Sequence, residues 1–132
     1  MGKETILIAD DDRVVVEFLS LELRAHGFAV REAADGMQVI MVVRRTPPAA
    51  ILLDVMMPGG TGLDVLKRLH SNVAMTKIPV LAMSANTDPD LPKRLEQLGA
   101  DAFLLKPVRP AEVVATLRRL VEKAAQAATL DS

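Results

Sequence analysis

Polar residues able to bind a cation and a phosphoryl group follow several short apolar runs in this sequence. They are Asp10, Asp11, Asp12, Asp54, Ser84 and Lys106. Carboxylates brought together repel one another and raise one another's pKa unless a cation compensates for their charge. Magnesium prefers oxygen ligands and often takes one or two carboxylates together with water and a phosphate. With a lysine and a serine hydroxyl nearby, this set predicts a site for Mg²⁺ and one phosphoryl group, with a carboxylate available as nucleophile.

The apolar runs that precede these residues are short, rich in β-branched residues and not alternating. Such runs are typical of strands that are covered on both faces. The predicted strands are Thr5–Ala9, Phe28–Arg31, Ala49–Leu53, Ile78–Met83 and Ala102–Leu105.

Segments with helical periodicity separate the predicted strands. The predicted helices are Arg13–Ala25, Met37–Arg45, Leu63–Ser71, Asp88–Leu98 and Pro110–Ala127. We expect Pro89 and Pro92 to lie in the first turn of the fourth helix and to shorten it, because proline is tolerated only there. We also expect Pro58–Gly62 to form a loop with conformational freedom at its glycines, and the last residues, Thr129–Ser132, to be frayed.

The alternation of five strands with five helices predicts an α/β fold. Its sheet should be parallel, five-stranded and covered by helices on both faces. Ligands of such sheets bind at the carboxyl ends of the strands. The polar residues named above should therefore meet at one edge of the sheet.

Composition excludes several classes of site. The chain has 132 residues, which suits one domain, and its formal net charge of −1 gives no long-range attraction to nucleic acid or anionic lipid. It has no Cys, Trp or Tyr, which excludes disulfides, thiolate metal sites and a cysteine nucleophile. No apolar stretch reaches the length of a membrane span. We therefore expect a cytoplasmic protein without membrane insertion or direct nucleic-acid binding.

Four motifs in this order resemble the receiver domain of two-component response regulators. They are Ile6–Asp12, Ile51–Gly59, Val80–Ala85 and Gly99–Pro107. The resemblance covers residues 4–122, with residues 123–132 as the end of the last helix and a C-terminal tail. It implies the (βα)5 flavodoxin-like fold, in a stand-alone regulator of chemotaxis or phosphorelay type or in a piece of a longer protein.

The resemblance also implies roles for individual residues. Asp54 would accept a phosphoryl group from the phosphohistidine of a histidine kinase or histidine phosphotransfer protein. The Mg²⁺ ligands would be Asp10, Asp11, Asp54 and the backbone carbonyl of Met56. Lys106 and Ser84 would bind the phosphoryl oxygens, and Ser84 and Phe103 would form the conformational switch. The peptide bond between Lys106 and Pro107 would be cis. The outcome would be altered binding of a downstream protein that the sequence does not identify.

Two side chains are expected to set how long the phosphoryl group persists. In the family that the sequence resembles, the residues two beyond the acceptor and two beyond the serine flank the path of the attacking water. Here they are Met56 and Asn86. A thioether has no donor and is only a weak acceptor, so Met56 orients water poorly. We therefore expect slow loss of the phosphoryl group.

Alternative interpretations remain open at this point. The chain is interpreted as a switch rather than a turnover enzyme, but a degenerate receiver would serve only as an interaction module. A phosphatase of the haloacid-dehalogenase type also uses an Asp nucleophile with a second Asp two residues on, as in Asp10 and Asp12. Asp12 is also suited to cap the first helix, and Phe103 to be an ordinary core residue.

The second predicted helix is unusually apolar. Six of the seven residues from Met37 to Val43 are apolar, more than one buried helix face of about 100° holds. Some of them should be exposed, where they would contact a partner or a second copy in a homodimer, or be tolerated as isolated apolar residues.

Overall fold

The computed structural model of the chain describes residues 3–57 and 62–131, in which strands and helices alternate. The strands are β1 (Thr5–Ala9), β2 (Ala29–Ala33), β3 (Ala50–Asp54), β4 (Val80–Ser84) and β5 (Ala102–Leu105). The helices are α1 (Arg13–Ala25), α2 (Gly36–Arg45), α3 (Gly62–His70), α4 (Leu91–Gln97) and α5 (Pro110–Asp131). Most of the predicted Pro58–Gly62 loop, residues 58–61, lies outside the described residues.

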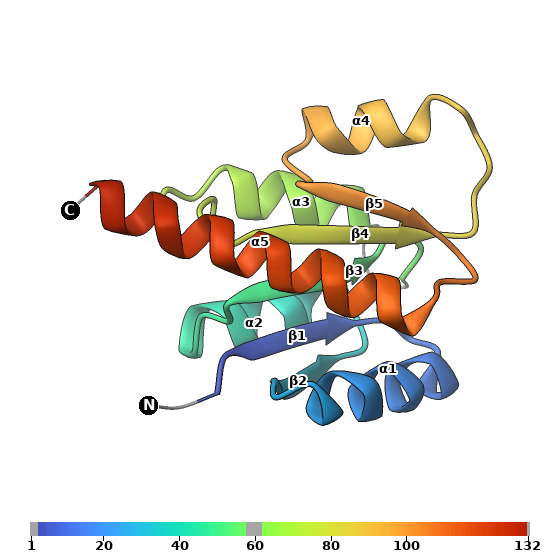
Figure 1. Cartoon of the computed structure of the whole chain (residues 1–132). Coiled ribbons are helices and arrows are strands. Elements are labelled where there is room, and N and C mark those ends of the chain that lie inside the picture. Colours follow the sequence, from blue (N-terminus) through green and yellow to red (C-terminus); the bar gives the residue numbers. More distant parts are fainter. Residues whose placement is uncertain (1–2, 58–61, 132) are drawn as a thin grey trace.

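The five strands form one parallel sheet in the order β2-β1-β3-β4-β5. Helices α1 and α5 cover one face of the sheet, and α2 and α3 cover the other (Figure 1). This is the predicted flavodoxin-like arrangement, and the fold prediction is confirmed. The strand order reverses at β1, so the carboxyl ends of β1 and β3 form the switch point at which such sheets bind ligands.

Two apolar clusters, one on each face, hold the layers together. Successive side chains of a strand point to opposite faces. In β1, Leu7 therefore packs with α2 and α3, whereas Ile6 and Ile8 pack with α1 and α5. All three are fully buried. The double-sided burial explains why the strands lack polar alternation.

The ends of two strands differ from the sequence prediction in a way that affects the site. β3 ends at Asp54 and β4 at Ser84, so both residues belong to the sheet instead of following it. Asp54 pairs in register with Met83, and Ser84 with Leu105. Because the strands were predicted from their apolar residues alone, each of these two predicted strands ended one residue before the observed end. A polar residue at the end of a strand can still pair with the neighbouring strand.

Helices α2 and α3 differ from their predicted bounds by one residue, and α4 and α5 differ by more. α4 begins at Leu91, so Pro92 lies in its first turn but Pro89 lies in the preceding turn, where the Leu91 N–H bonds to the Asp88 carbonyl at 3.1 Å. α5 runs to Asp131 instead of ending at Ala127 or fraying from Thr129. Alanine has the highest helix propensity, which supports this extension.

The apolar helix α2 exposes part of its surface, as predicted. Val39, Ile40 and Val43 are buried, whereas Met37 and Met41 are exposed. Among the described residues, no helix has the length and apolarity that crossing a bilayer requires.

Candidate functional site

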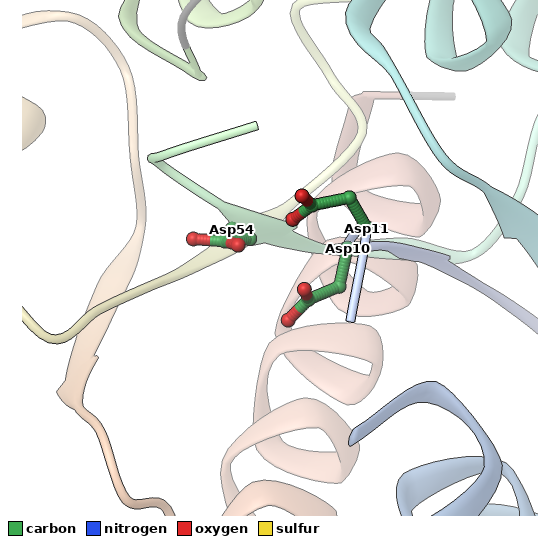
Figure 2. Close-up of side chains that lie close together, drawn as sticks. All are labelled: Asp10, Asp11 and Asp54. Carbon is green, nitrogen blue, oxygen red and sulfur yellow. The ribbon is translucent and has the colours of Figure 1, made fainter. Parts of the chain in front are cut away.

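Three carboxylates converge at the carboxyl ends of β1 and β3. Asp10 and Asp11 follow β1 directly, and Asp54 is the last residue of β3. Each offers an oxygen atom, and these atoms all lie within 4.8 Å of one another. Figure 2 shows the three side chains lying close together. The sequence prediction that these residues meet is therefore correct.

Backbone hydrogen bonds fix two of these carboxylates. The Asp10 N–H donates to the Ala33 carbonyl at 3.1 Å, and Asp10 Oδ1 accepts from the Asp12 N–H at 2.9 Å. Asp54 Oδ1 accepts from the Met56 N–H at 3.0 Å. Asp10 is 1 % and Asp54 5 % exposed, whereas Asp11 is exposed. The site thus has two buried, oriented carboxylates and one at the solvent boundary.

Lys106 supplies the positive charge opposite the carboxylates. Its Nζ lies 2.8 Å from Asp10 Oδ2 and 3.4 Å from Asp54 Oδ2. Its backbone N–H donates to the Ser84 carbonyl at 2.8 Å, and the Lys106–Pro107 bond is cis. The resemblance pairs this lysine with Asp54, and the structure adds a shorter contact with Asp10.

Burial and charge shift the pKa values of two groups. Burial raises the pKa of the Asp54 carboxyl, and the negative charge of Asp10 adds to the increase, while the Met56 N–H and Lys106 oppose it. Burial alone would lower the pKa of Lys106, but its hydrogen bond to Asp10 and the charges of Asp54 and Asp10 outweigh burial, and the pKa is raised. Lys106 therefore stays cationic beside a carboxyl group whose charged form is disfavoured.

Ser84 and Phe103 lie on neighbouring strands. Ser84 is fully buried, and its Oγ accepts from the Asn86 N–H at 3.0 Å, so its hydroxyl hydrogen remains available to an anion. Phe103 is half-buried, packs against the core on the α2–α3 face and lines a cavity of about 370 Å³ beside α4. Phe103 therefore packs against the core and also lines a cavity. This agrees both with an ordinary core residue and with a conformational switch.

The rim of the site consists of exposed residues just beyond the strand ends. Met56 is 64 % exposed although its backbone is held against Asp54. Asn86 is exposed, and its Oδ1 accepts from the Asp88 N–H at 2.9 Å. Asp12 caps α1, with Oδ1 accepting from the Val14 N–H at 3.0 Å, as its position before a helix suggests.

The donor set suits a magnesium ion. Oxygens about 2.1 Å from an octahedral cation lie up to roughly 4.2 Å apart, and one oxygen from each of Asp10, Asp11 and Asp54 lies within 4.8 Å of the other two. These are hard oxygen ligands with no competing thiolate, since the chain has no Cys. The acidic cluster therefore fits the cation that the sequence predicts.

Gly62 has a positioning role that the sequence analysis did not find. A Cβ at Gly62 would lie 2.5 Å from Val55 Cα and 2.9 Å from the Asp54 carbonyl oxygen. The Gly62 N–H donates to the Val55 carbonyl at 2.8 Å. The sequence predicts only a loop with conformational freedom at this glycine. The absence of a side chain instead lets α3 begin against the strand that carries Asp54.

An apolar groove adjoins the site on the α1 side. It has a volume of about 360 Å³, and the residues that line it include Phe18 of α1, Ala85, Lys106, Pro107 and Val108. The exposed apolar residues of α1 occur at intervals of four and three residues and therefore share one helix face. They are Val14, Phe18 and Leu21. We call these three residues the α1 stripe.

Comparisons with known proteins agree with this geometry. Residues 6–118 match the family model described as the response regulator receiver domain. The DNA-binding response regulator MtrA of Mycobacterium tuberculosis is 38% identical over 117 residues, which cover 88% of this chain and 50% of MtrA. Response regulator GtcR of Aneurinibacillus migulanus is 38% identical over 122 residues, or 92% of this chain and 49% of GtcR. The chain thus spans about half the length of these relatives.

Solved structures give the same fold. The receiver domain of the Francisella response regulator 1452 superposes with a TM-score of 0.86 at 25% identity, covering 92% of this chain and 98% of that one. The chemotaxis response regulator CheY4 of Vibrio cholerae superposes with a TM-score of 0.82 at 28% identity, covering 90% and 99% of the two chains. Nothing in these matches points to a phosphatase of the haloacid-dehalogenase type.

Proposed function

This chain belongs to the response regulator receiver domain family, a family of signalling switches, and on that premise we propose that Asp54 is its phosphoacceptor. The observation that carries the proposal is the contact of one lysine with two buried carboxylates. Lys106 lies 2.8 Å from Asp10 and 3.4 Å from Asp54. In both residues the other carboxylate oxygen accepts from the backbone N–H two residues on, so the choice of Asp54 rests on the match of its strand to the phosphoacceptor strand of the receiver family.

The proposed reaction is transfer of a phosphoryl group from a phosphohistidine. An Asp54 carboxylate oxygen attacks phosphorus, the phosphorus–nitrogen bond breaks, and the imidazole leaves with its electron pair and takes up a proton. The product is an acyl phosphate. Lys106 stabilises the charge on the phosphoryl oxygens, and the Ser84 hydroxyl donates to one of them. Both groups are held by the sheet before the reaction, so little reorganisation is needed.

A magnesium ion fits the acidic cluster, and we propose that Asp10, Asp11, Asp54 and the Met56 carbonyl hold it. When bound, it supplies positive charge to the phosphoryl oxygens. The chain's own contribution is orientation of the ligands. The Asp12 N–H fixes the Asp10 carboxylate, and the Met56 N–H fixes the Asp54 carboxylate.

We propose that the phosphodonor is a histidine kinase or histidine phosphotransfer protein that docks on the α1 stripe. Asp54 is 5 % exposed, so a macromolecular donor must cover the rim in order to reach it. Lys106 lines the groove beside Phe18, so the groove borders the site. An aromatic side chain beside such a groove is typical of an interaction hot spot. The stripe is suited to an amphipathic helix of the donor.

Phosphorylation is proposed to act through Ser84 and Phe103. A phosphoryl group that draws Ser84 toward it would alter the packing between β4 and β5, where these residues lie on adjacent strands. The cavity of about 370 Å³ beside α4 offers Phe103 room to change position. The surface around α4 and β5 would then change for a downstream protein.

Mass measurement tests the function. The protein is incubated with acetyl phosphate and Mg²⁺, and its intact mass is compared with that of Asp54→Asn. We expect the wild type to gain one labile phosphoryl group and the variant none. A degenerate receiver would gain none in either form, and a phosphatase would turn over a substrate without retaining the group. Equal labelling of the variant would refute the assignment of Asp54.

A further inference from the structure

The methionines of the described residues fall into buried and exposed groups. The buried ones are Met57, Met75 and Met83. The exposed ones are Met56 at 64 %, Met37 at 67 % and Met41 at 47 %. Met37 and Met41 lie on α2, whereas Met56 directly follows the strand that carries Asp54.

Met56 combines an accessible sulfur with a backbone bound to the proposed nucleophile. Its N–H donates to Asp54 Oδ1 at 3.0 Å. This bond fixes the start of the side chain beside Asp54 while the thioether remains in solvent. A change in the polarity of that side chain therefore alters the rim of the phosphoryl site without unpacking the core.

Methionine is the most readily oxidised side chain in this protein. The sequence contains no Cys, Trp or Tyr to compete for an oxidant. Susceptibility to oxidation follows exposure, and the product, methionine sulfoxide, is polar and chemically reversible. An oxidant that enters from solvent therefore reaches Met56 before Met57 or Met83.

We propose that Met56 is a redox-modification site, and that its oxidation to the sulfoxide by a peroxide shortens the lifetime of the phosphoryl group on Asp54. The inference rests on the proposed function and adds regulation of the same site. The sulfur lone pair attacks a peroxide oxygen, the oxygen–oxygen bond breaks and a sulfur–oxygen bond forms. The sulfur loses two electrons, and the departing hydroxide takes the proton of the sulfur-bound hydroxyl, which leaves the sulfoxide and water.

The direction of the effect follows from hydrogen bonding. A thioether is a weak acceptor and holds water poorly, whereas a sulfoxide oxygen is a strong acceptor. A water held at the rim is positioned to attack the acyl phosphate. The oxidised side chain of Met56 is polar and no longer shields the acyl phosphate from water. Both changes favour hydrolysis, and we expect decay to accelerate by about threefold to tenfold.

The first part of the test locates the modification. The wild type is treated with hydrogen peroxide, freed of oxidant and digested, and sulfoxide is quantified at each methionine by peptide mass spectrometry. We expect Met56 to oxidise about as fast as Met37, which is similarly exposed, and well ahead of Met57 and Met83. Oxidation of Met56 at the rate of the buried residues would overturn the proposal.

The second part measures consequence. The second part uses three proteins: the wild type, Met56→Leu and the double variant Met37→Leu/Met41→Leu. A peroxide-treated sample and an untreated sample of each are phosphorylated with acetyl phosphate. The decay of each is compared with that of its own untreated form at equal Mg²⁺. We expect acceleration in the wild type and in the α2 double variant, but not in Met56→Leu.

Other results have distinct meanings. Unchanged or slower decay of oxidised wild type would overturn the inference while leaving Asp54 as the acceptor. Acceleration in Met56→Leu equal to that in the wild type would assign the effect to another residue and also overturn it. Failure of the untreated wild type to accept a phosphoryl group would overturn the proposed function, and the inference with it.

Discussion

The site has a buried half and an exposed half, which lie only one or two residues apart in sequence. The buried half consists of Asp10, Asp54 and Ser84, at the ends of adjacent strands. The exposed half consists of Asp11, Met56 and Asn86, one or two residues further along each chain segment. The first set is oriented by the sheet and desolvated, and the second is in contact with water.

This difference separates two tasks. Groups that must stand in a fixed geometry lie where the ladder of the sheet defines their positions, as with Asp54 paired to Met83. Groups that contact the water around the cation, the attacking water or an oxidant lie just beyond the ends of the strands. Substitutions in or beneath the buried half should therefore affect transfer, and those on the rim should affect metal affinity and lifetime.

The largest effect is expected for Asp11→Ala, which removes the exposed cation ligand and leaves the acceptor in place. Loss of a residue that only hydrogen-bonds to a metal ligand weakens metal affinity by about 10- to 100-fold. Loss of a ligand itself should therefore weaken the affinity for Mg²⁺ by about 100-fold or more. Titration of Mg²⁺ into phosphorylation assays with acetyl phosphate measures this. Labelling that keeps the wild-type Mg²⁺ dependence would remove Asp11 from the ligand set.

Gly62→Ala probes the buried half without touching a reacting group. The new Cβ would meet Val55 Cα at 2.5 Å, so the backbone next to Asp54 must shift. A displacement of about 1 Å costs up to roughly 100-fold in rate, and we expect phosphorylation to slow by about 10- to 100-fold. Stopped-flow or mass-based labelling with acetyl phosphate measures the rate.

Gly27→Ala is the matched control for this substitution. Gly27 has a φ of +91° and no atom within 4 Å of an added Cβ. The change should cost about 1 kcal/mol of unfolding free energy through backbone strain and leave labelling unaltered. Equal slowing in both variants would show that general destabilisation, rather than the position of Asp54, is the cause.

Phe18→Ser tests docking on the α1 stripe and should affect only macromolecular donors. With a phosphorylated histidine phosphotransfer domain as donor, we expect a loss of about tenfold in kcat/KM, a usual size for an aromatic anchor. Labelling by acetyl phosphate should not change. Met41→Ser is the control, because Met41 is also exposed but lies on α2. A comparable loss in Met41→Ser, or none in Phe18→Ser, would refute the docking surface.

The smallest effect is expected for Met56→Asn on the rim. An amide orients water through both a donor and an acceptor, which a thioether does not. We expect phosphorylated Met56→Asn to decay about threefold to tenfold faster than the wild type at equal Mg²⁺. An unchanged decay rate would mean that Met56 does not slow hydrolysis, and that the exposed half has less influence on lifetime than proposed.

Sequence reasoning predicted the strands, their parallel order and the convergence of Asp10, Asp11 and Asp54, because apolar runs and polar residues at their ends are local signals. It did not predict that Lys106 lies closer to Asp10 than to Asp54, since that depends on how β5 ends relative to β1. It also missed the close approach of Gly62 to Val55, which is visible only once α3 is placed. The length of α5 was underestimated because an exposed alanine-rich end carries no apolar periodicity.

Chemical identification of the phosphorylated residue tests the assignment of Asp54 as the phosphoacceptor. The wild type is phosphorylated with acetyl phosphate and Mg²⁺, reduced with borohydride, which converts an aspartyl phosphate to homoserine, and sequenced by peptide mass spectrometry. We expect homoserine at position 54 and aspartate at positions 10, 11 and 12. Homoserine at any of those three positions, or a phosphate retained on Ser84, would contradict it.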